Sequence, residues 1–211
     1  TTFAGAPYDA GNRWVDATGA AARFNKPTDV ASHGLNLFVC DRYNNRIRQV
    51  VVASQVVTTF AGTPRKAGGA SGPVGTGQLD SVAAMAVSGD VVFVADFTGY
   101  TIRRIDATGN VQTIAGRYSH EGAADGGAMT GARFRDPHGI AVDADGVLYV
   151  ADSTADGAIR VIKDGVVSTP SLHGADLMFP GDLAVGADGA VYVTGGVGNT
   201  VVSFVSARTY P

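Results

Sequence analysis

Thr58-Thr59-Phe60-Ala61-Gly62 is one of three copies of the same short phrase in this chain. The other two copies are Thr1-Thr2-Phe3-Ala4-Gly5 and Gln112-Thr113-Ile114-Ala115-Gly116. A phrase that returns after about 50 residues is typical of proteins built from repeated structural units. The sequence therefore predicts a repeat array.

The clearest unit runs from about residue 137 to residue 170. Pro137-His138-Gly139-Ile140-Ala141-Val142-Asp143 predicts a short strand, and the Asp145-Gly146 step that follows is a strong hairpin signal. Further strands are predicted at 147–152, 158–162 and 166–169, with a turn at Asp164-Gly165 between the last two. Four short antiparallel strands in one unit form a blade of a β-propeller.

Four such units predict an all-β fold and a single domain over 1–211, with blades near 27–62, 82–116, 137–170 and 181–205. The last unit lacks a fourth strand. We therefore expect residues 1–5 to complete it by pairing near 200–205, because closing the ring hides both free sheet edges. The alternative is an open segment of a larger ring, which would expose an apolar radial face and self-associate.

The sequence Ala132-Arg133-Phe134-Arg135-Asp136-Pro137-His138-Gly139-Ile140-Ala141-Val142-Asp143, with the strands after it, strongly resembles the NHL repeat family. Ala22-Arg23-Phe24-Asn25-Lys26-Pro27 matches the same pattern again. The resemblance implies a β-propeller, and propellers of this family often have six blades. It also implies two known activities of related proteins, RNA binding and metal-dependent lyase chemistry.

Composition narrows the function only slightly. The formal net charge is −3, so the chain has no overall basic footprint and RNA binding is disfavoured. No apolar run approaches the roughly 20 residues that span a bilayer, so membrane insertion is not expected. Cys40, the single cysteine, is expected to be a small buried side chain. The opening residues are already the repeat phrase, so we expect a domain cut from a longer chain. No compartment is indicated.

The predicted binding face is the end of the blades that carries the long connections, near 6–26, 63–81, 117–136 and 170–180. Long loops on a rigid scaffold are the usual place for binding sites. Aromatic and arginine side chains are the commonest interface anchors. On this basis the candidate binding residues are Tyr8, Arg13, Trp14, Arg42, Tyr43, Tyr100, Tyr118, His120 and His173. Trp14 could equally fold back and seal its loop, and for the tyrosines packing between blades is the favoured alternative.

Charged residues recur at matching places in the units. We interpret the arginines of the third strands as outward-facing partners of carboxylates on neighbouring blades: Arg46, Arg48, Arg103, Arg104 and Arg160. Asp41, Asp96 and Asp152 end the second strands, where short acceptors usually bond the backbone N–H groups that follow.

The leading hypothesis is a non-enzymatic interaction domain that binds a protein or peptide, or a small-molecule ligand, without a cofactor. A metal-dependent lyase or hydrolase is the first alternative, since His120, His138 and His173 could converge on Zn²⁺. No pair of histidines has metal-ligand spacing, so no metal site is predicted. RNA binding is the second alternative.

Overall fold

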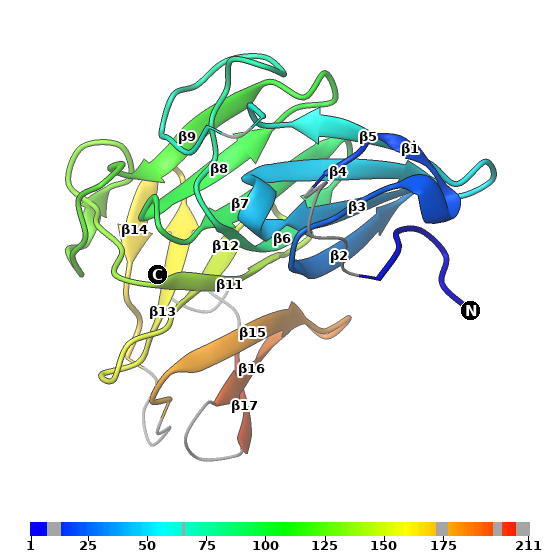
Figure 1. Ribbon diagram of the computed structural model, residues 1–211. Helices are drawn as coiled ribbons and strands as arrows, with labels where there is room; N and C mark the ends of the chain where they lie inside the picture. Colours follow the sequence, from blue (N-terminus) through cyan, green and yellow to red (C-terminus); the bar gives the residue numbers. More distant parts are fainter. Residues whose placement is uncertain (8–13, 65, 172–176, 196–199, 206–211) are drawn as a thin grey trace.

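The computed structural model describes residues 1–7, 14–64, 66–171, 177–195 and 200–205. Its strands form four antiparallel sheets that follow one another along the chain (Figure 1). The helical elements of the described residues are short 3₁₀ turns, and none is an α-helix. None of these turns is long and apolar enough to cross a membrane.

The four sheets repeat one plan, in which the first strand of each is innermost. The first sheet contains β2 (Pro27–His33), β3 (Asn36–Asp41), β4 (Arg46–Val51) and β5 (Val56–Ala61). The second contains β6 (Val82–Ser88), β7 (Val91–Asp96), β8 (Thr101–Ile105) and β9 (Val111–Gly116). The third contains β11 (Pro137–Val142), β12 (Leu148–Asp152), β13 (Ala158–Lys163) and β14 (Val166–Ser168). The fourth contains β15 (Pro180–Val185), β16 (Ala190–Gly195) and β17 (Thr200–Val205).

Two short strands that the sequence did not predict extend the first and third sheets. β1 (Ala17–Thr18) pairs with β5, and β10 (Gly126–Gly127) pairs with β14. Both belong to the loop that precedes the sheet. Each loop therefore returns from the outer edge of the sheet to its innermost strand.

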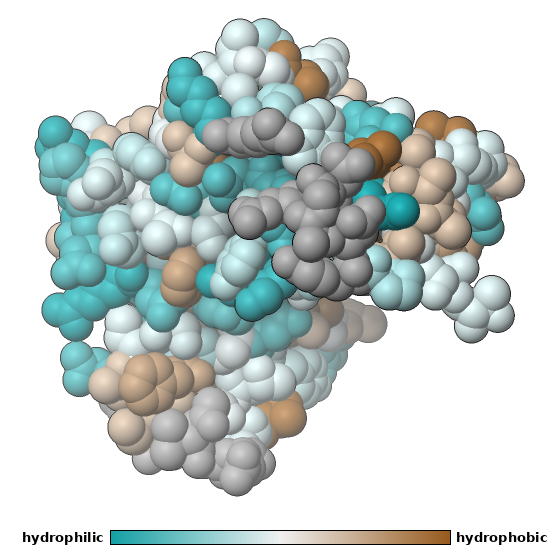
Figure 2. All heavy atoms as spheres, viewed as in Figure 1, coloured by the Kyte–Doolittle hydropathy of each residue, from teal (hydrophilic) through white to brown (hydrophobic). Residues whose placement is uncertain are grey.

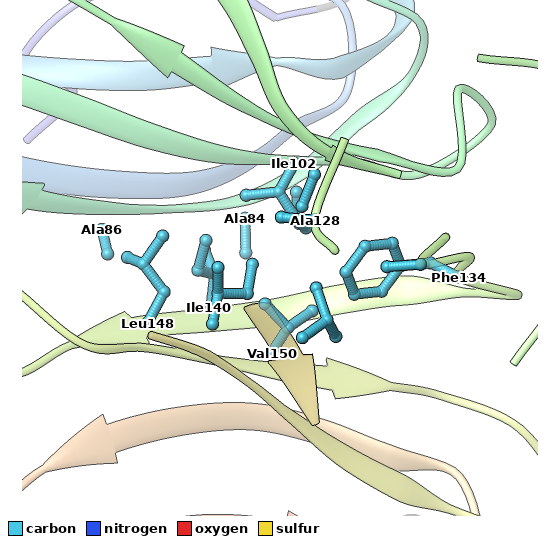
Figure 3. Packing of buried hydrophobic residues seen from close by; sticks show 13 residues of the cluster. Ala84, Ala86, Ile102, Ala128, Phe134, Ile140, Leu148 and Val150 are labelled. Atoms are coloured by element: carbon cyan, nitrogen blue, oxygen red, sulfur yellow. The ribbon is translucent and has the colours of Figure 1, made fainter. Parts of the chain in front are cut away.

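Successive sheets pack face to face through apolar cores. Between the second and third sheets, for example, Ala84 and Ile102 meet Ile140 and Val150, and Phe134 closes one end (Figure 3). Similar clusters join the first sheet to the second and the third to the fourth. Cys40 is fully buried in the first of these, as expected, and burial raises the pKa of its thiol well above the usual value.

The predicted completion of the fourth sheet by the N-terminus is wrong. Among the described residues, β17 pairs only with β16, and residues 1–5 form no strand. The N-terminal residues instead pack against the first sheet, where the Gly5 N–H donates to the Gly19 carbonyl and Ala4 packs near Val50 and Val57. The N-terminus lies at the right of Figure 1 and the fourth sheet at its lower edge.

The interpretation of the arginines as outward-facing is also wrong for four of the five, and the fifth, Arg104, is half-buried. Arg46, Arg48, Arg103 and Arg160 are at most 1% exposed. Three of them pair with an aspartate of their own sheet, not of a neighbouring one: Arg48 with Asp41, Arg103 with Asp96 and Arg160 with Asp152, at 2.9 to 3.1 Å. An unpaired buried charge is very costly, which explains why both members recur together.

The aspartates have a different role from the one predicted. Asp41, Asp96 and Asp152 accept hydrogen bonds from backbone N–H groups of the loop before the sheet, such as those of Asn25, Asp80 and Asp136. Each carboxylate thus joins its arginine, the end of the second strand and the incoming loop. The fourth sheet has Gly195 and Val202 at the matching places, so both charges are absent there together.

Asp96 is the carboxylate for which we expect a measurable pH effect. Its arginine, Arg103, bonds backbone carbonyls with its other arm, whereas Arg48 and Arg160 each bond a second carboxylate. Burial raises the pKa of Asp96 from 3.8 to about 7, although Arg103 acts in the opposite direction. The folded protein thus holds this proton more tightly than the unfolded chain, and the contribution of Asp96 to stability is lost as pH rises from 3.8 to about 7.

The measurement is urea unfolding across that pH range for the wild type and for Asp96→Asn, which cannot titrate. The free energy of unfolding of the wild type should fall more steeply with rising pH than that of the variant. A carbon-13 titration of the Asp96 carboxyl group should give the matching midpoint. Equal slopes for the two proteins would contradict the expectation.

Candidate functional site

The turn after β3 carries the most exposed of the predicted anchors. Tyr43, in the 3₁₀ turn η2 (Arg42–Asn44), is 55% exposed, and the Lys26 ammonium group lies 4.8 Å from the centre of its ring. This turn lies at the end of the sheets that also carries the long inter-sheet connections. A large aromatic ring beside a cation is a suitable contact for a partner.

Arg42 points from the same turn toward the second sheet. Its guanidinium group lies 4.7 Å from the centre of the Phe97 ring, and its Nε donates to Ser81 Oγ at 2.9 Å. Phe97 begins the equivalent turn of the second sheet, after β7. The arginine is therefore held in one orientation by a ring beneath it and a hydroxyl beside it.

The third sheet contributes a histidine and a carboxylate to the same place. The His138 ring meets the Phe97 ring edge-on, with centroids 6.1 Å apart. Asp136 lies just before β11, and its charge interacts with those of His138 and Arg42. Arg42, Ser81, Phe97, Asp136 and His138 thus meet where three sheets approach each other, and we call this group the Arg42 cluster.

Asp136 is the most unusual member of the cluster. Its Oδ1 atom is buried and has no hydrogen-bond partner in the structure. Burial raises the pKa of this carboxyl, while His138 and Arg42 act to lower it. A buried acceptor without a partner is costly, so Oδ1 is suited to receive a donor from a bound molecule.

Tyr118 and His120 lie on the loop between the second and third sheets. Tyr118 donates its hydroxyl proton to Asp80 Oδ2 at 3.1 Å, and Asp80 is the neighbour of Ser81 in the chain. His120 Nδ1 lies 2.8 Å from the Tyr118 carbonyl oxygen and the ring is exposed. The structure therefore links Tyr118 to the Arg42 cluster through the residues 80–81.

The positions of the remaining predicted residues say less about binding. Trp14 is half-buried, with the Arg46 guanidinium group 4.0 Å from its ring centre, which agrees with the loop-sealing alternative. Tyr100 is half-buried in the turn after β7 with a φ of 56°. Tyr8, Arg13 and His173 lie outside the described residues.

The sequence analysis did not identify Phe97 and Asp136 as site residues. Nothing in their local sequence separates them from ordinary turn residues.

The described part of the chain holds no group of three or more His, Cys, Asp and Glu side chains that could bind a metal ion. A cavity of about 140 Å³ lies at the opposite end of the first two sheets, near Phe38, Phe60 and the His33–Asp90 pair. It contains none of the predicted binding residues.

Comparison with known proteins agrees with this architecture. The NHL repeat model matches residues 134–162. No curated protein matches the sequence significantly. Solved structures with a similar fold include an auxiliary nutrient binding protein from Bacteroides ovatus, at 15% identity and a TM-score of 0.66 over 87% of this chain and 49% of that one.

Two further similar structures are enzymes. Virginiamycin B lyase from Staphylococcus aureus is 16% identical with a TM-score of 0.56, over 87% of this chain and 56% of that one. A gluconolactonase from Xanthomonas campestris is 18% identical with a TM-score of 0.58, over 81% and 54%. The chain therefore spans about half the length of these three proteins. At such low identity the likeness shows a shared fold, and propeller folds carry many activities.

Proposed function

Since this chain carries an NHL repeat within a propeller-like array of sheets, we propose that it is a non-enzymatic binding domain for a protein or peptide. The binding surface is the long-connection end, centred on the Arg42 cluster and Tyr43. The observation that carries the proposal is the fixed, half-buried Arg42 guanidinium group, which neighbours the exposed Tyr43 in the chain and interacts with the charge of Asp136, whose Oδ1 has no hydrogen-bond partner.

The chemistry of the cluster describes the segment it would bind. Arg42 and His138 favour a carboxylate or carbonyl oxygen, because both can donate hydrogen bonds. Asp136 Oδ1 favours an N–H or O–H donor close to that acceptor. A peptide backbone or a polar side chain offers both groups a few ångströms apart, and Tyr43 adds apolar contact at the rim.

The proposal can be tested by selecting peptides from a displayed library against the wild-type protein. Arg42→Ala and Tyr43→Ala should each weaken the selected peptides about tenfold or more, as interface anchors do. Lys163→Ala is the matched control, since Lys163 is exposed at the opposite end of the third sheet and should change nothing. Peptides that bind both cluster variants as tightly as the wild type would contradict the proposal.

A metal-dependent lyase or hydrolase is the second candidate. It is favoured by the half-buried Asp136 beside His138 and by the two enzymes among the similar structures. Elemental analysis of the purified protein distinguishes the candidates. A stoichiometric metal that is lost in His138→Asn would support the enzyme, and no bound metal in the wild type would argue against it.

A further inference from the structure

Each sheet presents the same apolar pattern on its trailing face, the face directed toward the next sheet along the chain. An alanine of the first strand lies opposite an aromatic residue of the second strand in every sheet: Ala31 and Phe38, Ala86 and Phe93, Ala141 and Tyr149, Ala184 and Tyr192. A branched aliphatic residue follows on the third strand: Ile47, Ile102, Ile159 and Val201. One contact surface is thus repeated four times.

Three of these trailing faces are covered and the fourth is not. Ile47, Ile102 and Ile159 are at most 1% exposed, because the next sheet packs on them, whereas Val201 is 69% exposed. Tyr149 is fully buried, and its equivalent Tyr192 is 39% exposed. The fourth sheet therefore keeps much of the pattern of an internal contact without the sheet that would cover it.

On the opposite, leading face of the first sheet only the innermost strand is uncovered, because Val50 and Val57 farther out are buried under the chain's own N-terminal residues. In the other three sheets the equivalent positions, Met85, Ile140 and Leu183, are at most 8% exposed, because the preceding sheet packs on them. In the first sheet that position is Val30, which is 59% exposed. In Figure 2 the hydrophobic residues of this sheet gather around β1, at its outer edge.

The loop before the first sheet resembles the loop before the third sheet, which packs between two sheets. Its Asp16 bonds Arg48 at 2.6 Å, as Asp125 of the corresponding loop bonds Arg160 at 2.9 Å. Phe134 of that second loop is fully buried between two sheets (Figure 3). The equivalent Phe24 is only partly buried, although its guanidinium partner lies at the same 5.0 Å from the ring centre.

We propose that the trailing face of the fourth sheet binds the leading face of the first sheet in a second copy of this chain. The contact is head-to-tail, since it reproduces the order in which the sheets pack within one chain. Two copies would supply two identical contacts and close a ring of eight sheets, the upper end of the usual range of about four to eight. The similar solved proteins, which are about twice as long, show that this fold accommodates larger arrays.

The oligomeric state of the purified chain tests this inference. Light scattering after gel filtration at about 100 µM, where even weak specific interfaces associate, should give twice the 21.5 kDa of one chain. Val201→Asp on the trailing face and Val30→Asp on the leading face should each give a monomer. Leu35→Asp, at a 76% exposed position in a turn outside both faces, should remain a dimer.

Mixing the two interface variants separates a head-to-tail contact from a symmetric one. Val201→Asp keeps an intact leading face and Val30→Asp keeps an intact trailing face, so the mixture should form a heterodimer held by one contact. Circular dichroism checks that each variant is folded. A wild-type monomer at the same concentration would overturn the proposal, and so would dimers in either variant alone.

Discussion

Replacing Arg160 with methionine is expected to lower the free energy of unfolding by about 3–5 kcal/mol. The side chain is 1% exposed and bonds Asp152 at 3.1 Å and Asp125 at 2.9 Å. Methionine fills part of the volume but leaves the buried Asp152 carboxylate without its cation. Urea unfolding at neutral pH measures the loss.

Two comparisons make this expectation specific. Arg135→Met removes an exposed pair with Asp156, whose atoms are 3.6 Å apart, and should cost less than about 1 kcal/mol. The double variant Asp152→Gly/Arg160→Val copies the fourth sheet, which has Gly195 and Val202 at these two places. It should recover much of the stability lost in Arg160→Met, because no unpaired charge remains buried. Similar losses for Arg160→Met and Arg135→Met would refute the argument.

Gly116→Ala is expected to be the second most damaging change, at about 2–5 kcal/mol. Gly116 ends one copy of the repeated phrase and has a φ of 82°, which side chains rarely adopt. A Cβ atom there would lie 2.4 Å from the Tyr100 carbonyl oxygen and 3.0 Å from the Phe134 ring. The substitution thus combines backbone strain with a clash inside the packing of two sheets.

Gly146→Ala separates these two effects. Gly146 has the same φ of 82°, but a Cβ atom at that position meets nothing within 4 Å. Its cost should be limited to the strain of the left-handed backbone, about 1 kcal/mol. Thermal or urea unfolding of both variants measures the difference, which reports the clash alone. Equal losses would mean that the close approach to Tyr100 is unimportant.

The repeated phrase shows why the sheets could be predicted. Its glycine is required in the second sheet by a positive φ and a close backbone approach, and Gly62 meets the same conditions beside the Asn45 carbonyl oxygen. Both requirements are local to one unit. The strand alternation and the Asp-Gly turns are local too, so they predict the four sheets and the end that carries the long connections.

The candidate site was predictable only in part. Arg42 and Tyr43 were identified because arginine and tyrosine in a turn suggest an interface. Phe97 and Asp136 were not, because their role depends on three sheets meeting at one place. The distances from Phe97 to Arg42 and to His138 connect residues that are more than 40 positions apart.

The sequence by itself determined the repeat, the strands, the turns and the burial of Cys40. These follow from side-chain alternation and backbone geometry within a unit of a few dozen residues. Only the tertiary structure decided that the arginines are buried with the aspartates of their own sheets, and that the N-terminus packs on the first sheet and not the last. Both depend on how whole sheets are placed relative to one another. Many weak contacts between distant residues set that placement, and no local pattern records it.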